Sequence, residues 1–377
     1  MTASTTPLSP RRRMLVLCPY PMGVAAGQRL KYEQYLDDWR AMGLDVDISP
    51  FMDDAMWRIV HKPGHYAAKA QGVLKGHFRR LYDLTRIRRY DVVYVFMWVT
   101  PFGTSLLERL ARALARRLVY DVEDNVLVGN SLPSGENPNK IVAFLKGPHK
   151  ARYLIANADQ VISASPFFNE TCRGMNKRRK SAYIPPSVDA DRFAPSPVAR
   201  ETLTPTIGWT GTFSSKIYLD LLNDVFRKLA RRAPFKLKVI GNFDYELDGV
   251  DLEVVQWSKE REAEDLQSID IGVYPLPIDD WVLGKAGLKA IQYMAIGLPT
   301  VATDIGTSSL VITRDVDGLL VKTEDEWLAA LERLLRDPAL RRRLGAAGRE
   351  TVVAKYSTQA IAARYREVLL DVIAETS

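Results

Sequence analysis

The sequence predicts an α/β fold made of two doubly wound domains that face a central cleft. Segments with strand character alternate with segments of helical periodicity, and the alternation starts again after a proline-rich stretch at residues 185–205. The length of 377 residues also exceeds that of one ordinary hydrophobic core. Alternating strands and helices form parallel sheets covered on both faces, and ligands bind at the carboxyl ends of the strands. We therefore expect the ligand site in the cleft between the domains.

Short apolar runs bounded by proline, glycine or charged residues predict the strands of the first half. These strands are expected at residues 13–21, 45–49, 91–98, 117–124 and 158–165. Residues 27–43 have helical periodicity and end in a glycine, and residues 104–117 predict a second helix.

The second half repeats this order. Its strands are expected at residues 206–212, 235–242, 253–257 and 271–276, with helices at 218–233 and 260–269. A helix followed by a strand is expected over residues 284–306, then a strand or turn at 317–321, and helices close the chain.

The composition disfavours several classes of protein. The apolar fraction of 47% and the charged fraction of 26% are typical of soluble globular proteins. Two cysteines cannot form a disulfide framework, and the four histidines are scattered without the spacing of metal ligands. Neither a G-x-G-x-x-G pattern after the first strand nor a G-x-x-x-x-G-K-[ST] pattern occurs, which disfavours hydride transfer and P-loop chemistry.

Two lysines in the second half raise a question of charge. Lys285 and Lys289 stand four residues apart at the expected start of a helix, where like charges share a face and the helix dipole disfavours cations. The first turn of a helix is also a ready anion site, because its N–H groups lack partners within the helix. Two lysines there suit a diphosphate. The alternative interpretation is that both side chains project into water.

Strand ends in the second half supply further candidates. Gly211 ends the first of these strands, and Gly241 and Asn242 end the next one. Glycine allows backbone N–H groups to approach a ligand closely. Trp257, at the end of a third strand, is a candidate for contact with a nucleotide base.

The stretch GLKAIQYMAIGLPTVATDIG at residues 287–306 resembles the signature of retaining glycosyltransferases of family 4, which have the GT-B fold of two Rossmann-like domains. Other similar stretches follow in order, namely IGWTGT, VIGN, DIGVYPL, DGLLV and the tail LRDPALRRRLGAAGRETVVAKYS. PYPMGVAAGQR and YDVEDN resemble a bacterial subset of that family. The resemblance covers nearly the whole chain and is strongest over residues 205–357.

The resemblance implies a division of labour between domains. Residues 1–186 would bind the acceptor, residues 187–356 would bind a nucleotide-diphosphate sugar, and residues 357–377 would form a helix that crosses back to the first domain. The sugar would pass, with retained anomeric configuration, to a glycan or lipid-linked acceptor in cell-envelope polysaccharide or glycolipid synthesis. No cofactor and no obligate metal would be needed.

The sequence departs from the family's pair of glutamates eight positions apart, because Gly284 and Gln292 occupy those positions. Gln292 can still hydrogen-bond a ribose or a sugar hydroxyl, and Asp279 or Asp280 is a candidate to replace the missing acid. We nevertheless count Gly284 among the donor-binding positions.

The family's Arg and Lys after the first strand of the second domain also match poorly. Thr212 stands where Arg is common, and Lys216 is the candidate for the Lys. Lys285 and Lys289 could supply the missing positive charge. Lys285 is then a candidate catalytic residue, since fixed cations stabilise the charge that develops on a leaving diphosphate.

In the first domain, the stretch YDVED places Asp121, Glu123 and Asp124 at a strand end that is expected to face the cleft. Relatives often carry a histidine near this position that touches the sugar, and Glu123 or Asp124 is the expected substitute with a catalytic role. The alternative is an acid that caps a helix or a turn.

The loop after the first strand is the expected acceptor or phosphate loop. It contains Gly23, Gly27, Gln28 and Arg29, and its glycines would permit close approach of the leaving phosphate or the acceptor. The alternative is an ordinary turn between a strand and a helix.

Two other functions stay open. A sugar-nucleotide epimerase of the same fold would need several acids and a histidine in the cleft, and the second domain has no histidine. A catalytically inactive sugar-nucleotide-binding subunit is the other alternative, because the acid pair is altered.

The charge is unevenly distributed. Residues 1–190 carry a net charge of +11 and residues 191–377 carry −4, while residues 57–90 hold nine basic residues, one acid and several aromatic residues. The latter segment is interpreted as a solvated helix face, as a patch for an anionic membrane surface or acidic acceptor, or as a nucleic-acid site, although no nucleic-acid recognition motif accompanies it. We expect a cytoplasmic protein without nucleic-acid partners, bound peripherally to the inner face of the cytoplasmic membrane if the second interpretation holds.

Overall fold

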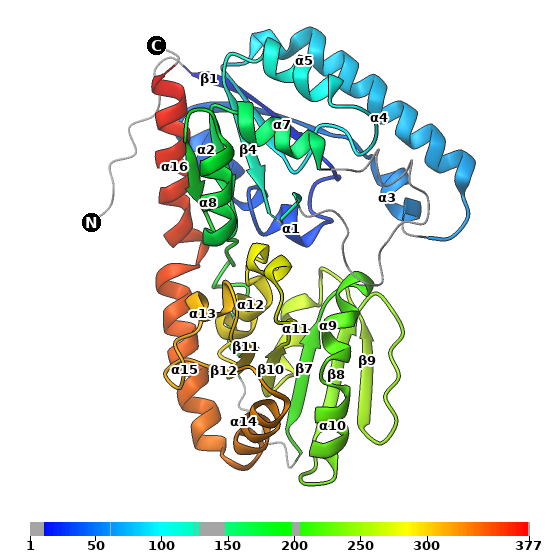
Figure 1. The fold of residues 1–377 in the computed structure, drawn as a ribbon, viewed down its shortest axis with the longest axis vertical. Coiled ribbons are helices and arrows are strands. Elements are labelled where there is room, and N and C mark those ends of the chain that lie inside the picture. Colours follow the sequence, from blue (N-terminus) through cyan, green and yellow to red (C-terminus); the bar gives the residue numbers. More distant parts are fainter. Residues whose placement is uncertain (1–10, 61, 124, 128–147, 198–203, 376–377) are drawn as a thin grey trace. The chain divides into compact units, whose positions relative to one another are not determined.

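The computed structural model describes residues 11–60, 62–123, 125–127, 148–197 and 204–375. The chain divides into two units: residues 1–185 and 362–377 form the first unit, and residues 186–361 form the second. Figure 1 shows both units as strands flanked by helices. No helix within the described ranges is long and apolar enough to span a bilayer.

The first unit is built on a parallel sheet with the strand order β2-β1-β3-β4-β5-β6. The strands are β1 (Arg12–Cys18), β2 (Leu44–Pro50), β3 (Val92–Phe96), β4 (Leu118–Val122), β5 (Gln160–Ser163) and β6 (Ser181–Tyr183). Strands β3 and β4 are buried along their whole length, as expected for parallel strands that helices cover on both faces. The first five strands coincide with the expected segments, and β6 is an addition.

The helices of the first unit surround this sheet. They are α1 (Ala26–Arg29), η1 (Glu33–Tyr35), α2 (Leu36–Ala41), α3 (Asp54–Val60), α4 (Tyr66–Arg86), η2 (Ile87–Arg89), α5 (Leu106–Leu114), α7 (His149–Asn157) and α8 (Pro166–Met175). The last helix of the chain, α16 (Thr358–Ala374), also contributes, because the Tyr365 ring lies 4.8 Å from the Tyr35 ring and 5.7 Å from the Trp39 ring.

The second unit has a parallel sheet with the order β12-β11-β10-β7-β8-β9. Its strands are β7 (Thr206–Thr210), β8 (Lys236–Gly241), β9 (Asp251–Gln256), β10 (Ile271–Tyr274), β11 (Thr300–Thr303) and β12 (Leu319–Val321). The chain adds β8 and β9 on one side of β7 and returns to place β10 on its other side. The point between β7 and β10 is therefore a topological switch point, where open α/β sheets bind ligands.

The helices of the second unit cover both sides of its core. They are η3 (Phe213–Ser215), α9 (Lys216–Asp220), α10 (Asn223–Ala230), α11 (Glu262–Gln267), η4 (Asp280–Gly284), α12 (Leu288–Ala295), α13 (Ser308–Val311), α14 (Glu324–Arg336) and α15 (Pro338–Lys355). Trp209, Phe226 and Leu331 are among the buried residues that pack between sheet and helices.

Three predicted helices are wrong in their extent. The helix expected at 218–233 is divided by a turn at Leu221 and Leu222 into α9 and α10. The expected helix at 27–43 is broken into α1, η1 and α2, because Lys31 and Glu33 turn inward to bind Asp121 and the Gly23 N–H. The helix expected from residue 284 starts only at Leu288. Gly287 has a φ of 77°, a left-handed conformation that ends the preceding turn and precludes a continuous helix.

Candidate functional site

The carboxyl ends of β7, β8 and β9 are joined to one another by hydrogen bonds. The Phe213 N–H donates to Asn242 Oδ1 at 2.9 Å, and the Trp257 N–H donates to the Gly241 carbonyl at 2.8 Å. These contacts bring the predicted residues Gly211, Gly241, Asn242 and Trp257 to one edge of the second sheet.

The glycines at this edge are explained by contacts within the protein. A Cβ on Gly211 would overlap the Trp209 ring and lie 2.6 Å from Ser215 Oγ. A Cβ on Gly241 would lie 2.9 Å from the Gly211 carbonyl oxygen. Neighbouring side chains, and at Gly241 also the backbone of Gly211, therefore leave no room for a side chain at either position without rearrangement.

Thr212 and Lys216 lie just beyond this edge. Thr212 forms a reciprocal capping box with Ser215 at the start of η3. The Lys216 ammonium lies 3.1 Å from both carboxylate oxygens of Asp220, and 5.1 Å from the centre of the Tyr245 ring. The charge of Lys216 is thus compensated inside the protein, and its role in donor binding stays a prediction.

Lys289 lies over the switch point. It belongs to the first turn of α12, and its Nζ atom lies 5.7 Å from the centres of both the Trp209 and the Tyr274 rings. Trp209 is on β7 and Tyr274 ends β10, so the ammonium lies near the point where the order of the strands reverses. Gly287 at the N-cap has no side chain to occupy the N–H groups of this turn.

Lys285 does not share a helical face with Lys289, so that part of the prediction is wrong. Lys285 is extended and follows η4, three residues before α12 begins. Its Nζ atom lies 4.2 Å from the centre of the Trp281 ring. Each lysine thus contacts the face of an aromatic ring, an arrangement that stabilises a cation. The repulsion inferred from the four-residue spacing does not arise within one helix.

Gln292 is buried in α12 and forms part of a polar chain that the sequence did not reveal. Its Nε2 atom donates to Glu262 Oε1 at 3.2 Å, and Glu262 Oε2 lies 3.3 Å from Arg192 Nη2. Gly284 is buried as well, in η4. No spacing rule links these residues, because 30 positions separate Gln292 from Glu262.

The acids proposed to replace the one missing at Gly284 lie at the start of η4. Asp279 caps this turn, and its Oδ1 atom accepts a hydrogen bond from the Trp281 N–H at 2.9 Å. Asp280 is exposed. Sequence reasoning also missed Tyr293, whose hydroxyl accepts from the Thr210 N–H at 2.8 Å and thereby fixes the end of β7.

In the first unit, Glu123 follows β4 and packs against the loop after β1. A Cβ on Gly27 would overlap the Glu123 carboxylate, so the two predicted elements are in direct contact. Burial raises the pKa of the Tyr20 phenol, and the Glu123 carboxylate raises that pKa further. Asp124 lies outside the described residues.

Asp121 does not face outward, contrary to the prediction. Its carboxylate is buried and pairs with the Lys31 ammonium and the Tyr94 hydroxyl, while the Tyr365 hydroxyl donates to it at 3.3 Å. These three partners come from the segment after α1, from β3 and from α16. Asp121 is therefore an interior anchor of the first unit.

The predicted acceptor or phosphate loop is held by its own side chains. The buried Gln28 amide donates to the Tyr20 carbonyl at 3.0 Å and to Glu33 Oε1 at 2.6 Å. The Gly23 N–H donates to Glu33 Oε2 at 2.8 Å, with Gly23 at a φ of 76°. Arg29 is also buried. Gln28 thus shapes the loop, and contact of this loop with a ligand stays a prediction.

Comparison with known proteins supports the resemblance in the second unit. Residues 204–337 match the model of a family described as glycosyl transferases group 1. Over 74 residues, 19% of this chain, the sequence is 40% identical to the lipopolysaccharide core biosynthesis glycosyltransferase LpsD of Rhizobium meliloti (strain 1021). The chain spans only 22% of the length of that curated relative.

Solved structures extend the similarity in fold to nearly the whole chain. Sucrose-phosphate synthase from Thermosynechococcus elongatus superposes with a TM-score of 0.71 at 19% identity, covering 97% of this chain and all of that one. Anabaena Alr3699/HepE in complex with UDP and glucose gives a TM-score of 0.65 at 15% identity, covering 96% of this chain and all of that one.

The predicted fold class of two doubly wound parallel α/β domains is therefore confirmed, and both of these solved structures share it. The span matched by the family model holds the whole second sheet and every residue predicted to bind the donor. This part of the chain is similar to the glycosyl transferases group 1 family.

Proposed function

We propose that the protein is a retaining glycosyltransferase of family 4 that moves a sugar from a nucleotide-diphosphate sugar to a glycan or lipid-linked acceptor. The observation that carries this proposal is the position of Lys289, in the first turn of α12 and over the switch point between β7 and β10. That position lies within the residues that match the glycosyl transferases group 1 family. The related structure in complex with UDP and glucose supports a nucleotide-sugar donor.

The proposed chemistry follows from the leaving group. Breaking the bond between sugar and phosphate leaves negative charge on the diphosphate and positive charge on the anomeric carbon. The N–H groups at the start of α12 and the Lys289 ammonium would stabilise that negative charge, and Lys285 would add a second cation. Retention needs no enzymic nucleophile if the leaving phosphate accepts the proton of the acceptor hydroxyl.

The remaining predicted residues take supporting roles in this proposal. Gly211, Gly241 and Asn242, at the strand ends, would border the donor, and Trp257 would lie near the base of the donor nucleotide. The first unit would bind the acceptor, where Glu123 would contact sugar hydroxyls.

We also propose that no obligate metal takes part, as the resemblance implies. In the part of the chain that the structure describes, no group of three His, Cys, Asp or Glu side chains forms a candidate metal site. Synthesis of a cell-envelope polysaccharide or glycolipid is the proposed pathway, since the Rhizobium relative is named for lipopolysaccharide core biosynthesis. The acceptor would be met from the cytoplasm, at the inner face of the cytoplasmic membrane.

The test combines a ligand screen with one pair of variants. UDP, GDP, ADP and their sugars are screened by thermal shift, since a ligand that binds only the folded state raises the melting temperature. Lys289→Ala should then weaken binding of the selected nucleotide about tenfold or more, because hydrogen bonds to charged groups contribute about 1.5–3 kcal/mol.

Lys228→Ala is the matched control. Lys228 is a lysine of the same unit whose ammonium pairs with Glu324 on the surface. Slow donor hydrolysis or transfer would support a transferase, a changed sugar would indicate an epimerase, and binding without turnover would indicate an inactive subunit. Equal affinity of the Lys289→Ala and Lys228→Ala variants would remove the assignment of Lys289.

A further inference from the structure

Helix α4 carries an apolar stripe on its exposed side. Leu74, Phe78, Leu81 and Tyr82 have exposed fractions of 60%, 69%, 49% and 63%. Their spacing of four, seven and eight residues from Leu74 places them on one face of the helix. Large apolar side chains grouped in this way on a surface indicate an interaction site.

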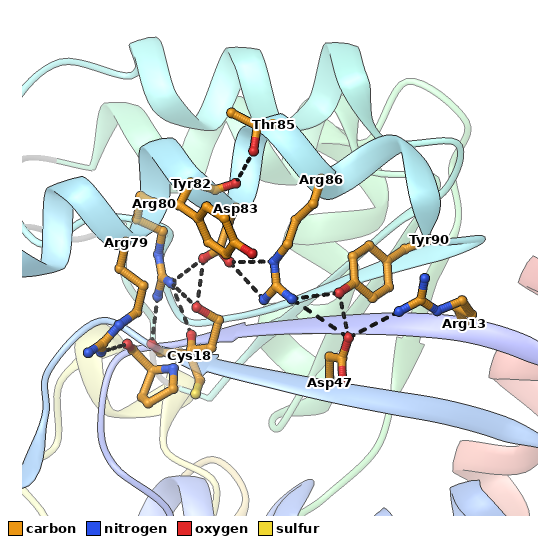
Figure 2. Close-up of polar contacts among 12 residues, drawn as sticks. Arg13, Cys18, Asp47, Arg79, Arg80, Tyr82, Asp83, Thr85, Arg86 and Tyr90 are labelled. Carbon is orange, nitrogen blue, oxygen red and sulfur yellow. Dashed lines mark hydrogen bonds and ion pairs between the residues drawn. The ribbon is translucent and has the colours of Figure 1, made fainter.

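The opposite face of α4 is firmly attached to the first unit. Figure 2 shows Arg80 reaching inward, where it donates to the Cys18 carbonyl at 2.8 Å and to Asp83 Oδ2 at 3.0 Å. Asp83 also accepts from Ser49 Oγ at 2.6 Å. Gly76 packs so closely on Phe51 that a Cβ would lie 2.5 Å from the ring. These contacts hold the helix in one orientation, with the stripe directed outward.

The count of nine basic residues in segment 57–90 suggested a strongly charged surface. Not all of these residues contribute to it. Arg80 is buried against Asp83, and Arg86 lies 3.0 Å from Asp83 Oδ1 and 2.8 Å from the Tyr90 hydroxyl (Figure 2). Lys75 pairs with Asp53 at 2.6 Å. The net charge of +8 for residues 57–90 therefore overstates the charge available to a partner.

Exposed basic residues nevertheless remain at both ends of α4. Arg58 and Lys62 precede it, and Arg88 and Arg89 follow it in η2. Within the described residues, none of these four forms an ion pair with a carboxylate. The only acid of α4 itself is the buried Asp83. The exposed side of the helix thus combines apolar and aromatic side chains with positive charge and no acid.

Helix α5 lies beside α4 in the same unit (Figure 1). It exposes Leu106 and Leu110, which are one helical turn apart, and Arg109 between them. A pair of neighbouring helices with exposed leucines and arginines is typical of a surface that lies on a bilayer.

We propose that α4 lies in the interface of an anionic bilayer and inserts Leu74, Phe78, Leu81 and Tyr82 among the lipids. Charge complementarity identifies this occupant, since an anionic leaflet attracts the basic residues at both helix ends while aromatic rings favour the headgroup region. The inference rests on the proposed function in one respect, namely that a lipid-linked acceptor gives this attachment a purpose. Beyond the proposed function, the inference identifies the helix and the side chains that contact the membrane.

Co-sedimentation with vesicles of phosphatidylcholine, alone or with phosphatidylglycerol, provides the first test. The full chain should bind only the anionic vesicles, and binding should weaken as salt rises because screening shortens the reach of charge. Phe78→Ser should lower the partition coefficient at least about tenfold, since a large apolar side chain no longer leaves water. Phe167→Ser is the matched control, because Phe167 is 45% exposed on α8 of the same unit.

A second measurement reports insertion directly. Both native cysteines, Cys18 and Cys172, are buried, so a polarity-sensitive dye can be attached selectively to Phe78→Cys or to Phe167→Cys. Anionic vesicles should shift the emission to shorter wavelength for the dye at position 78 and leave it unchanged at position 167.

Equal recovery of the wild type on both lipids, recovery on neither, or equal behaviour of the two serine variants would overturn the proposal. Self-association through the stripe, abolished by Phe78→Ser in gel filtration without vesicle binding, would also overturn it. Donor binding by thermal shift should be the same in Phe78→Ser as in the wild type. If the wild type binds the donor but not the vesicles, this inference alone is refuted. If the wild type binds no donor, the proposed function is refuted.

Discussion

Replacing Gln292 by glutamate would restore the second acid of the family's pair, and the structure predicts that this change is harmful. The Gln292 amide donates to Glu262 Oε1 at 3.2 Å inside the second unit. Gln292→Glu exchanges that donor for a carboxylate that faces another buried carboxylate. The repulsion raises the pKa of the introduced acid, because the pair can ionise fully only at the cost of two close negative charges.

Two limits set the size of the effect. Two unit charges about 3.2 Å apart at an effective dielectric constant of about 20 repel by about 5 kcal/mol. Protonation offers a less costly route. A glutamate with an ordinary pKa of about 4.3 needs about 3.7 kcal/mol to be held protonated at pH 7. The loss of unfolding free energy should therefore not exceed about 3.7 kcal/mol there, and Arg192 beside Glu262 lowers it toward about 3 kcal/mol.

The sign of the pH dependence is fixed by the raised pKa. The folded variant holds a proton that its unfolded chain releases above about pH 4.3, so the variant loses stability relative to the wild type as pH rises. The deficit should be about 1 kcal/mol at pH 5, grow by up to about 1.4 kcal/mol per pH unit, and level off near about 3 kcal/mol at pH 7. Donor turnover should not increase, since the restored acid faces Glu262 instead of a ligand.

Urea unfolding followed by tryptophan fluorescence at pH 5 and pH 7 measures this deficit, and Trp209 in the core of the second unit provides a local probe. The double variant Gln292→Glu/Glu262→Gln is the control, because it restores one amide and one carboxylate with their positions exchanged. It should recover more than half of the loss at pH 7. A deficit that is equal at the two pH values, or no deficit at pH 7, would refute the reasoning.

Two further variants test the first unit. Gly27→Ala should displace the Glu123 carboxylate with little change in melting temperature, because the overlapping atoms are the far end of a flexible side chain. Transfer kinetics should show a fall in sugar transfer of about tenfold or more, and calorimetry should show an unchanged donor affinity. Asp121→Asn should lower the unfolding free energy by about 3–5 kcal/mol, since it leaves the buried Lys31 without its counter-charge. A double-mutant cycle with Lys31→Met, measured by urea unfolding, should give a strongly non-additive result. Unchanged transfer in the first variant, or additive losses in the second, would contradict these assignments.

The strands could be predicted from the sequence because the signal for each one is local. A parallel strand covered on both faces is buried along its length and mostly apolar, as β3 and β4 are. The restart of the pattern after residues 185–205 likewise needs no knowledge of distant contacts. The candidate edge of the second sheet followed from the same local signals, since strand ends in a parallel sheet lie side by side.

The parts that were wrong depend on contacts between distant residues or on one backbone conformation. The left-handed Gly287 moved the start of α12 to Leu288, and periodicity cannot report a single φ angle. Asp121 appeared in the sequence as a strand-end acid, but Lys31 comes from 90 residues away to neutralise it. Counting charges likewise could not show that Arg80 is buried against carbonyl oxygens of other strands and loops.

The structure explains only one of the two departures from the family's acid pair, which are Gly284 and Gln292. Nothing in the structure explains the glycine at position 284, whereas a neutral side chain at position 292 follows from the presence of Glu262, whose other oxygen binds Arg192. The amide therefore keeps this part of the second unit from gaining a second buried negative charge. The ammonium groups of Lys285, which precedes α12, and of Lys289, in its first turn, lie over aromatic rings. An amide at position 292 adds less negative charge beside these lysines than a glutamate would, which is compatible with the anionic donor proposed for the switch point.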